Sequence, residues 1–318
     1  MVEHHIVEIP LDVSRQIVSD LDSQSLRRLA RVSKAWQTAA EPTLWRTISF
    51  SAKQCPAIGG VEEFVSDDME DELEDWVLGQ YRFLQAALKK QPARALYIQE
   101  LRVECTASTA TILCAILEGT QSSLRQLVVG AATDMGASEH FISRCGDTLR
   151  TVLRSFSTMQ SFPELRRLSL ILVDDQWDAF WSSLLRLVPN LDTLSVDFLD
   201  HPLDRMIGAS LIPTLPPLVE LSVTVTSQTF PIFADLVQRS CTLQRLHLRG
   251  RGLSYSLLPD SEVDKLVKCN SLKHVKLDDD GEETNMAWHT MLERKGAFDC
   301  VETLVIGFPA FWVSLSPV

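Results

Sequence analysis

The sequence lacks a long apolar run and an excess of basic residues, and each absence excludes a class of protein. No apolar segment approaches the roughly 18 residues that a membrane-spanning helix needs, so we expect no membrane partner. The chain has 42 Asp and Glu against 30 Lys and Arg, which leaves a net charge of −12. Because phosphate binding needs a basic surface, we expect no nucleic-acid partner. The opening MVEHHIVEIP lacks the regions of a secretory signal, and neither end shows a lipidation pattern.

The cysteines lack any CxxC pair, and their number is odd. Because a zinc site needs clustered ligands, the dispersed set predicts no metal centre and no disulfide framework. We interpret them as reduced thiols of a cytoplasmic and/or nuclear protein. The seven are Cys55, Cys105, Cys114, Cys145, Cys241, Cys269 and Cys300.

Motifs of the common enzyme classes are also missing. The sequence has no GxGxxG, GxxxxGK[ST], HExxH or GxSxG pattern, and its seven histidines are dispersed. The run DDDGEET at 278–284 begins like a calcium-binding loop, but His289 stands where the closing glutamate would be. We expect a solvated turn there, and a chain that is no enzyme and has no catalytic residue, no metal and no cofactor.

What is present is typical of a globular protein of more than one domain, with 45% hydrophobic and 23% charged residues among 318. The chain divides into a helical block at 6–50, an acidic linker or loop at 51–75, and a repetitive part at 76–318. Carboxylates occupy nine of the fifteen positions from 61 to 75, and their mutual repulsion favours a solvated segment. A lure for a basic substrate is the alternative. A helix from about Trp76 to Lys90, ended by Pro92, should follow.

The repetitive part contains one phrase of the form apolar-x-x-apolar-x-apolar. It occurs as IQELRV at 98, LRQLVV at 124, LRRLSL at 165, LDTLSV at 191, LVELSV at 218, LQRLHL at 243, LKHVKL at 272 and VETLVI at 301. Chance alone would give roughly six such triplets, so the spacing is the informative part. The intervals are 26, 41, 26, 27, 25, 29 and 29 residues, and LRTVLRSF at 149 could be a degenerate unit in the long one.

The phrase predicts a strand rather than a helix. In a strand, positions i+3 and i+5 share one face, whereas in a helix they point to different sides. Leu168 and Leu170 should therefore point inward and Ser169 outward, as should Leu246 and Leu248 against His247. Helix-like segments lie between the phrases at 175–190, 230–240 and 261–269. Strands alternating with helices at this period predict a solenoid of parallel strands.

This part of the chain resembles the leucine-rich-repeat fold, in the longer-repeat variety with helices on the convex side. The resemblance implies an α/β architecture with parallel strands inside and helices outside. Repeats of that family usually carry Asn or Cys three residues after the third apolar position. Its absence predicts a somewhat irregular solenoid; the corresponding residues are Thr106, Ala132, Val173, Leu199, Thr226, Arg251, Asp280 and Pro309.

The helical block is too small to bury its apolar residues. Val13, Ile17 and Leu21 recur at four-residue spacing, which predicts one face of a first helix. The segment DSQS offers capping residues for a second helix, and a third should run from about Lys34 toward Trp45. Domains below about 40 residues usually need a metal, disulfides or a partner. With neither metal nor disulfide expected, the block should be covered by another protein.

The residues IPLDVSRQIVSDLDSQSLRRLARVSKAWQTAAEPTLWRTI resemble the F-box, from the aliphatic-Pro start to the closing PTLW. They depart from it slightly, with Ile9 before Pro10 and Ser33 where Cys often stands. Joined to leucine-rich repeats, in an architecture of the fungal type, the resemblance implies a three-helix F-box that binds the Skp-type adaptor of an SCF ubiquitin ligase. Through the adaptor it implies association with a cullin and a RING protein.

The resemblance also implies which residues contact the adaptor. Packing within the block is the alternative for each, evenly balanced for Leu29 and Val32, and Trp45 could instead pack on the first repeats. The implied contacts are Pro10, Leu11, Ile17, Leu26, Leu29, Val32, Trp36, Leu44 and Trp45.

The two parts together predict a non-catalytic substrate-recognition subunit, with an unknown protein substrate bound on the outward side chains of the strands. Neighbouring phrases bring a basic set together, suited to an acidic or phosphorylated segment: Arg245, His247, Arg249, His274 and Lys276. A solvated face partly neutralised by Asp278 is the alternative there, and the weaker candidates are Asp197, Glu220, Ser222 and Thr224. A scaffold that acts outside protein degradation is the alternative function. We expect Phe311 and Trp312 to shield the last strand.

Overall fold

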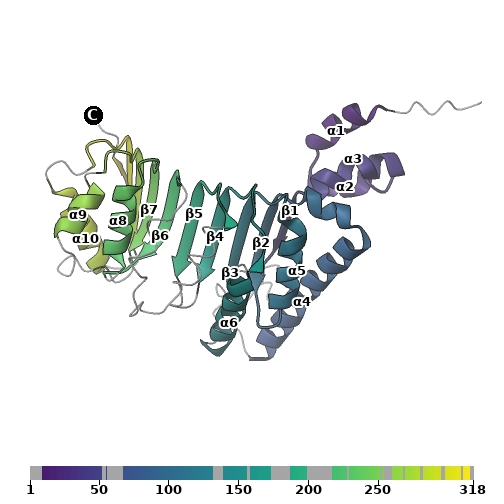
Figure 1. Cartoon of the computed structure of the whole chain (residues 1–318), viewed down its shortest axis with the longest axis horizontal. Coiled ribbons are helices and arrows are strands. Elements are labelled where there is room, and N and C mark those ends of the chain that lie inside the picture. The colour runs from purple at the N-terminus through teal and green to yellow at the C-terminus, as the bar shows by residue number, and fades with distance from the viewer. Residues whose placement is uncertain are drawn as a thin grey trace, which may run out of the picture.

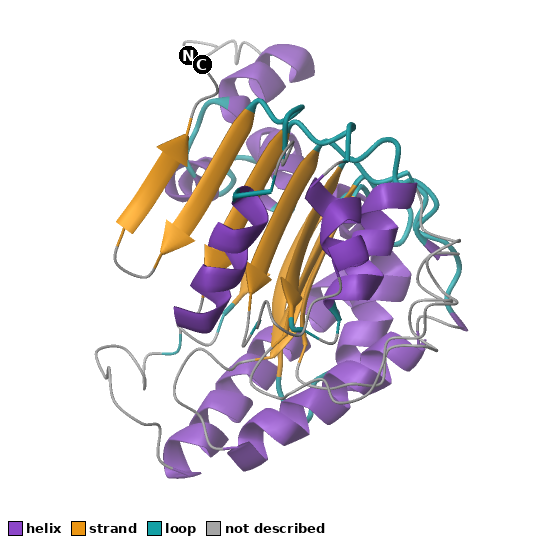
Figure 2. Cartoon of the chain, turned by 90° about the vertical axis from the view of Figure 1, so that its left-hand side faces the viewer, coloured by secondary structure: helices purple, strands orange, loops and turns teal. Residues whose placement is uncertain are grey.

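The computed structural model describes residues 9–51, 55, 67–131, 139–155, 158–172, 187–198, 217–227, 229–250, 253, 260–267, 269–279, 282–294, 298–308 and 311–315. Three short helices at the N-terminus lead into one long sheet, and the later helices pack along one side of it (Figure 1). Seen along the sheet in Figure 2, the strands form a curved layer with the helices beside it. The predicted α/β solenoid behind an N-terminal helical block is confirmed.

The helical block consists of α1 (Leu11–Ser19), α2 (Ser23–Leu29) and α3 (Lys34–Leu44). The Asp22 carboxylate begins α2 by accepting from the N–H groups of Gln24 and Ser25 at 2.8 and 2.9 Å, and the hydrogen bonds from Ser25 lower its pKa. In the same way the Ser33 hydroxyl accepts from the N–H of Trp36 and begins α3. The prediction of three short helices is therefore confirmed.

The core of this block is very small. Its buried cluster consists of Val18, Leu26, Ala39 and Ala40. The predicted first helical face is wrong in one residue, because Leu21 lies beyond the end of α1 and turns back onto the cluster. With two alanines among four buried residues, the block buries little apolar surface of its own.

The sheet has ten strands in sequential order. The strands β1 to β9 are parallel, and β10 closes the sheet antiparallel to β9. Their bounds are β1 Thr47–Phe50, β2 Glu100–Cys105, β3 Gln126–Ala131, β4 Arg167–Leu172, β5 Thr193–Phe198, β6 Glu220–Val225, β7 Arg245–Gly250, β8 His274–Asp279, β9 Thr303–Phe308 and β10 Phe311–Leu315.

Each of the eight predicted phrases coincides with one strand, from β2 to β9. The register stacks equivalent leucines, so that Leu168 pairs with Leu194 and Leu221 with Leu246. Leu168 and Leu170 are buried whereas Ser169 is half-buried, as the alternation predicts. Burial of such a side chain contributes about 1.5–3 kcal/mol, and the stacked rows form one continuous core with the helices.

Two strands were not predicted, and the first of them joins the helical block to the sheet. The segment WRTISF at 45–50 fits the repeat phrase, but the next copy begins only at 98. The carbonyl of Arg46 accepts from the N–H groups of Gln99 and Glu100 at 2.9 and 3.0 Å. The same double contact recurs between successive repeats, for example from Arg125 and Gln126 to Gln99. The end of the block is therefore the first rung of the solenoid.

The long interval between the second and third phrases holds a helix, not a repeat. The helix α6 (Glu139–Ser155) covers the segment at 149 that could have been a degenerate unit, and β3 pairs directly with β4. Of the predicted helices, α8 (Phe230–Arg239) and α9 (Asp260–Val267) are confirmed. The prediction at 175–190 falls outside the described residues except for its last four positions.

The helix α4 (Asp67–Lys90) begins earlier than predicted, so the expected loop is wrong from Asp67 onward. Its acidic tract is not wholly solvated, because Glu70 and Glu74 are buried beside Leu73. Glu74 accepts from Arg144 at 2.9 Å and from Ser108, which compensates its loss of hydration. The predicted end at Pro92 is confirmed, because a short 3-10 helix, η2 (Pro92–Tyr97), follows.

Two further helices complete the described layer, α5 (Ala110–Thr120) and α10 (Glu282–Leu292). The run at 278–284 joins the end of β8 at Asp279 to the start of α10 at Glu282, and the residues between them, where the turn was expected, lie outside the described part. Thr106 and Thr226 stand where the family ladder residue would be, and each N–H donates to the hydroxyl of the threonine three residues on.

The side chains of Phe311 and Trp312 lie outside the described part. Within the described part, no helix is both long and apolar enough to cross a membrane.

Candidate functional site

The helical block exposes more large apolar side chains than the rest of the described chain together. Of the seven that are exposed among the described residues, five lie in this block: Ile9, Leu11, Val13, Ile17 and Val32. Val32 is the most exposed of them, at 71%. This concentration of exposed apolar side chains on one small block exceeds the ordinary scatter of single residues.

The geometry of α1 explains this exposure. Its inner face carries Ser14 and Val18, which are buried against α3. Val13 and Ile17 then point away from the core, because they lie one position earlier in each turn. The sequence gives α1 two apolar sides, and the block can cover only one of them.

Eight of the nine residues implied as adaptor contacts fall into three groups, and Trp45 stands apart from them. Pro10, Leu11, Ile17 and Val32 are exposed, and Leu29, Trp36 and Leu44 are partly buried around the small core. Leu26 is 3% exposed, so it supports the block from inside and does not contribute to an open face. The implied contacts do not include Ile9 and Val13, although both are as exposed as Leu11.

The exposed apolar face is bordered by positive charge. Arg27, Arg28, Arg31 and Lys34 are all exposed, and none of them makes an ion pair with another described residue. Arg27 and Arg28 lie in the last turn of α2, Arg31 precedes Val32 in the turn that follows, and Lys34 begins α3. On a chain of net charge −12, this border gives the block a local charge opposite to that of the whole. A partner with a carboxylate rim would fit it.

Trp45 faces the solenoid, as the alternative reading of this residue proposed. It packs against the large core, and the Arg94 guanidinium lies 4.7 Å from its ring centroid. The same guanidinium donates to Glu41 at 2.6 Å, and Gln91 donates to the second oxygen of that carboxylate at 3.3 Å. These contacts join α3 to η2 and hold the helical block against the first repeats.

The open face of the sheet brings the five predicted substrate residues together. Arg245 lies beside His274 in the register of β7 and β8, His247 lies beside Lys276, and Arg249 follows on β7. They point away from the core because the leucines between them are buried.

Each of the three permanent cations of this cluster has a carboxylate partner. Arg245 donates to Glu220 at 3.0 Å, Arg249 to Asp197 at 2.7 Å, and Lys276 to Asp278 at 2.7 Å. Of the weaker candidates on the earlier strands, Glu220, Asp197 and Ser222 are thus partners of the basic set. Thr224 donates to Asp197 instead. The cluster is a network of alternating charge rather than a free basic patch. Its positive charge is neutralised not only by Asp278 but also by Glu220 and Asp197.

His247 lies at the centre of this network. Burial lowers its pKa, although the hydrogen bond that its Nε2 makes to the Asp278 carboxylate at 2.6 Å opposes the change. Burial also acts to raise the pKa of Asp278, but the hydrogen bonds from Lys276 and His247 outweigh it and leave that pKa lowered. His247 is therefore held neutral and Asp278 charged at physiological pH.

Ser222, His247 and Asp278 form a chain of hydrogen bonds that uses the residue types of a hydrolase triad. The Ser222 hydroxyl lies 3.1 Å from Nδ1 of the imidazole, and Asp278 lies at the other nitrogen. All three residues lie in the interior of paired strands, where backbone N–H groups serve the sheet ladder. Acyl transfer needs unpaired N–H donors to stabilise the oxyanion. We therefore interpret this series of hydrogen bonds as structural.

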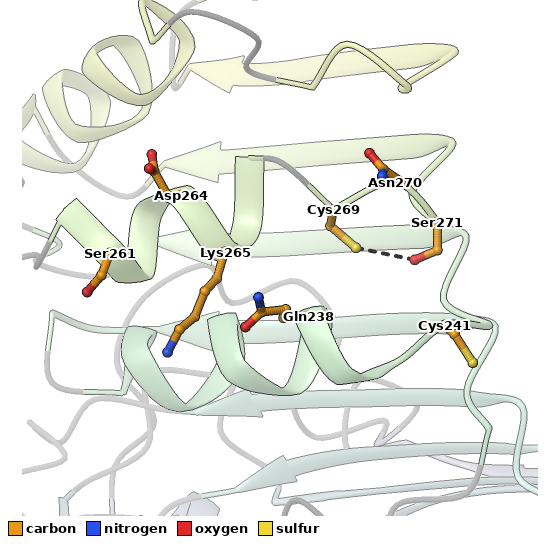
Figure 3. A pocket seen from close by; sticks show the side chains of 8 residues that line it. All are labelled: Gln238, Cys241, Ser261, Asp264, Lys265, Cys269, Asn270 and Ser271. Carbon is orange, nitrogen blue, oxygen red and sulfur yellow. Dashed lines mark hydrogen bonds between the residues drawn. The ribbon is translucent and has the colours of Figure 1, made fainter.

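An open hollow of about 780 Å³ lies between α8 and α9 and extends to the turns that follow them (Figure 3). Its lining is polar, and Lys265 is already bound by Asp235 at 2.6 Å and Glu262 at 2.8 Å. Cys269 points toward Ser271, and Cys241 lies at the far end. No cluster of three metal-binding side chains occurs among the described residues. This hollow offers no unpaired charge to a ligand.

Comparison with known families supports the reading of the N-terminal block. A family model described as F-box-like matches residues 6–51. The chain therefore contains an F-box-like domain, at the position where the resemblance placed it. Such a domain implies binding to a Skp-type adaptor in a cullin complex, and F-box proteins are generally non-catalytic adaptors. No curated protein matches the chain significantly.

Proposed function

We propose that this chain is the substrate-recognition subunit of an SCF-type ubiquitin ligase. The observation that carries the proposal is the coincidence of the F-box-like match at 6–51 with the exposed apolar face of α1 and Val32. A Skp-type adaptor would cover this face. A standard interface of roughly 1,600 Å² supplies enough apolar burial for stable association.

The solenoid is the proposed substrate-binding part. Its open face presents the network around Arg245, His247 and Lys276, and His274 at its rim. Because Glu220, Asp197 and Asp278 already pair with the cations, an acidic or phosphorylated segment would have to displace them. The best-suited substrate is therefore one that carries both signs of charge and exchanges these pairs one for one.

The chain would make or break no bond itself. Its contribution would be to hold the substrate near the ubiquitin-charged enzyme and so raise the effective concentration. Such an effect requires a fixed distance between the docking face and the recognition face. The contacts of Arg94 with Glu41 and Trp45, and the entry of β1 into the sheet, support that requirement.

The test is capture of a purified Skp-type adaptor by the full chain. We expect the double variant Ile17→Glu with Val32→Glu to weaken binding at least about 100-fold, because both side chains would bring a charge into the apolar interface. Leu96→Glu is the matched control, since Leu96 is 61% exposed but lies outside the matched segment. Unchanged binding by the double variant would overturn the proposal.

A further inference from the structure

The outer face of α4 carries a second apolar stripe. One side of this helix packs into the core through Leu73, Val77, Tyr81 and Leu84. On the other side, residues recur at intervals of four, three, four, three and four, which is the spacing of a coiled-coil seam. These residues are Glu72, Trp76, Gly79, Phe83, Ala86 and Lys90.

Five of the six residues of this stripe are exposed, with Phe83 at 73% the most exposed large apolar side chain of the described chain. Trp76 is half-buried and packs in part against the core, so only part of its side chain is open to a partner. A Cβ added at Gly79 would meet nothing within 4 Å, so open space lies over this position of the stripe. The helix lies at the end of the helical layer nearest the F-box-like block, next to α5 (Figure 1). A single exposed phenylalanine is ordinary, but a seam of this spacing is not.

The stripe is complementary to itself when a second copy lies antiparallel. With the two-fold axis level with Tyr81, Phe83 of one copy meets Gly79 of the other, and Trp76 meets Ala86. Glu72 then meets Lys90 at both ends. Each large side chain faces a small one and each acid faces a base, over roughly 27 Å of helix.

We propose that α4 is a dimerisation surface, through which two copies of this chain associate antiparallel about a two-fold axis. A self-complementary patch closes as a symmetric dimer and leaves no open end for further association. The inference does not rest on the proposed function, because α4 begins at Asp67 and lies outside the matched segment 6–51.

Sedimentation of the full chain at micromolar concentration tests the proposal. We expect a species of twice 35.7 kDa. Phe83→Ser should weaken the dimer at least about 100-fold, because one substitution removes two central contacts. Gly79→Leu should weaken it as well by filling the space that Phe83 of the other copy would occupy, while the open space around this position lets the monomer fold normally. Circular dichroism melting confirms that both variants are folded.

Charge reversal tests the antiparallel pairing of Glu72 with Lys90 most directly. Glu72→Lys or Lys90→Glu alone should weaken the dimer about tenfold, because each places two like pairs at the ends. A mixture of the two variants should associate as tightly as the unaltered chain, since every end pair is again of opposite sign. Leu96→Ser is the control, because Leu96 is nearly as exposed as Phe83 but lies off the stripe. A monomeric full chain, a dimer indifferent to Phe83→Ser, or a mixture no tighter than its components would overturn the proposal.

Discussion

The F-box-like block and the solenoid place their apolar residues in opposite ways. The block buries a cluster of four residues, two of them alanine, and exposes five large apolar side chains. The solenoid stacks its leucines inside one continuous core and presents polar and charged side chains on its open face. The second part is therefore stabilised by its own packing, whereas the first leaves apolar surface uncovered. This difference supports the proposal that the block docks to an adaptor and the solenoid binds the substrate.

The largest expected effect is on the free energy of unfolding, and it comes from a substitution in the core of the solenoid. Leu246→Ala should lower the free energy of unfolding by about 2–5 kcal/mol, because it leaves a cavity between β6 and β8 in the stacked row. Val32→Ala should change it by less than about 0.5 kcal/mol, because that side chain contacts mainly solvent. Urea unfolding of the full chain measures both. Comparable losses for the two variants would contradict the division drawn here.

The next effect concerns the junction between the two parts. Arg94→Ala should cost about 1–3 kcal/mol, because it leaves the largely buried Glu41 carboxylate with only Gln91 and uncovers Trp45. Hydrogen exchange should show the amides of α3 opening first. Arg239→Ala is the matched control, since its pair with Asp235 is more exposed and should contribute little. Equal effects of both substitutions would mean that the junction does not couple the parts.

A smaller effect concerns the pH dependence of the solenoid's stability, to which His247 contributes. Because the pKa of His247 is lowered in the fold, the unfolded chain binds this proton more readily, and stability should fall as the pH drops below the ordinary value of 6.5. The charged neighbours that face it are Asp278, Lys276 and Arg249. His247→Gln should reduce the loss of stability between pH 7 and pH 5. His289→Gln, at an exposed position of α10, should leave that loss in place.

The repeats could be predicted from sequence because period and phrase are local properties. All eight phrases became strands, and the phrase spacing settled the architecture. The strand β1 was missed because residues 51–97 separate it from the next copy, although WRTISF fits the template. The start of α4 was missed because nine carboxylates argued for a loop. Repulsion between them is relieved by partners distant in sequence, such as Arg144 for Glu74.

The sequence could predict which residues come together in the candidate sites, but not their partners or their burial. The sequence brings Arg245, His247 and Lys276 onto neighbouring strands, and the register confirms this. It could not show that Asp197 reaches across β6 to Arg249, because that contact depends on side-chain conformation. In the block, family resemblance named Leu26 and Val32 alike, whereas the fold buries the first and exposes the second.

The smallest effect tests how little stability the block has in reserve. Ser33→Ala removes the hydroxyl that caps α3 and should cost about 0.5–2 kcal/mol, with Ser33→Asp restoring most of it. In the solenoid such a loss would be absorbed by the large core. In a block with four buried residues it should raise the exchange rates of the α3 amides several-fold while those of β4 to β7 stay unchanged. A uniform change along the chain would show that the block shares the stability of the solenoid and does not depend on its partner.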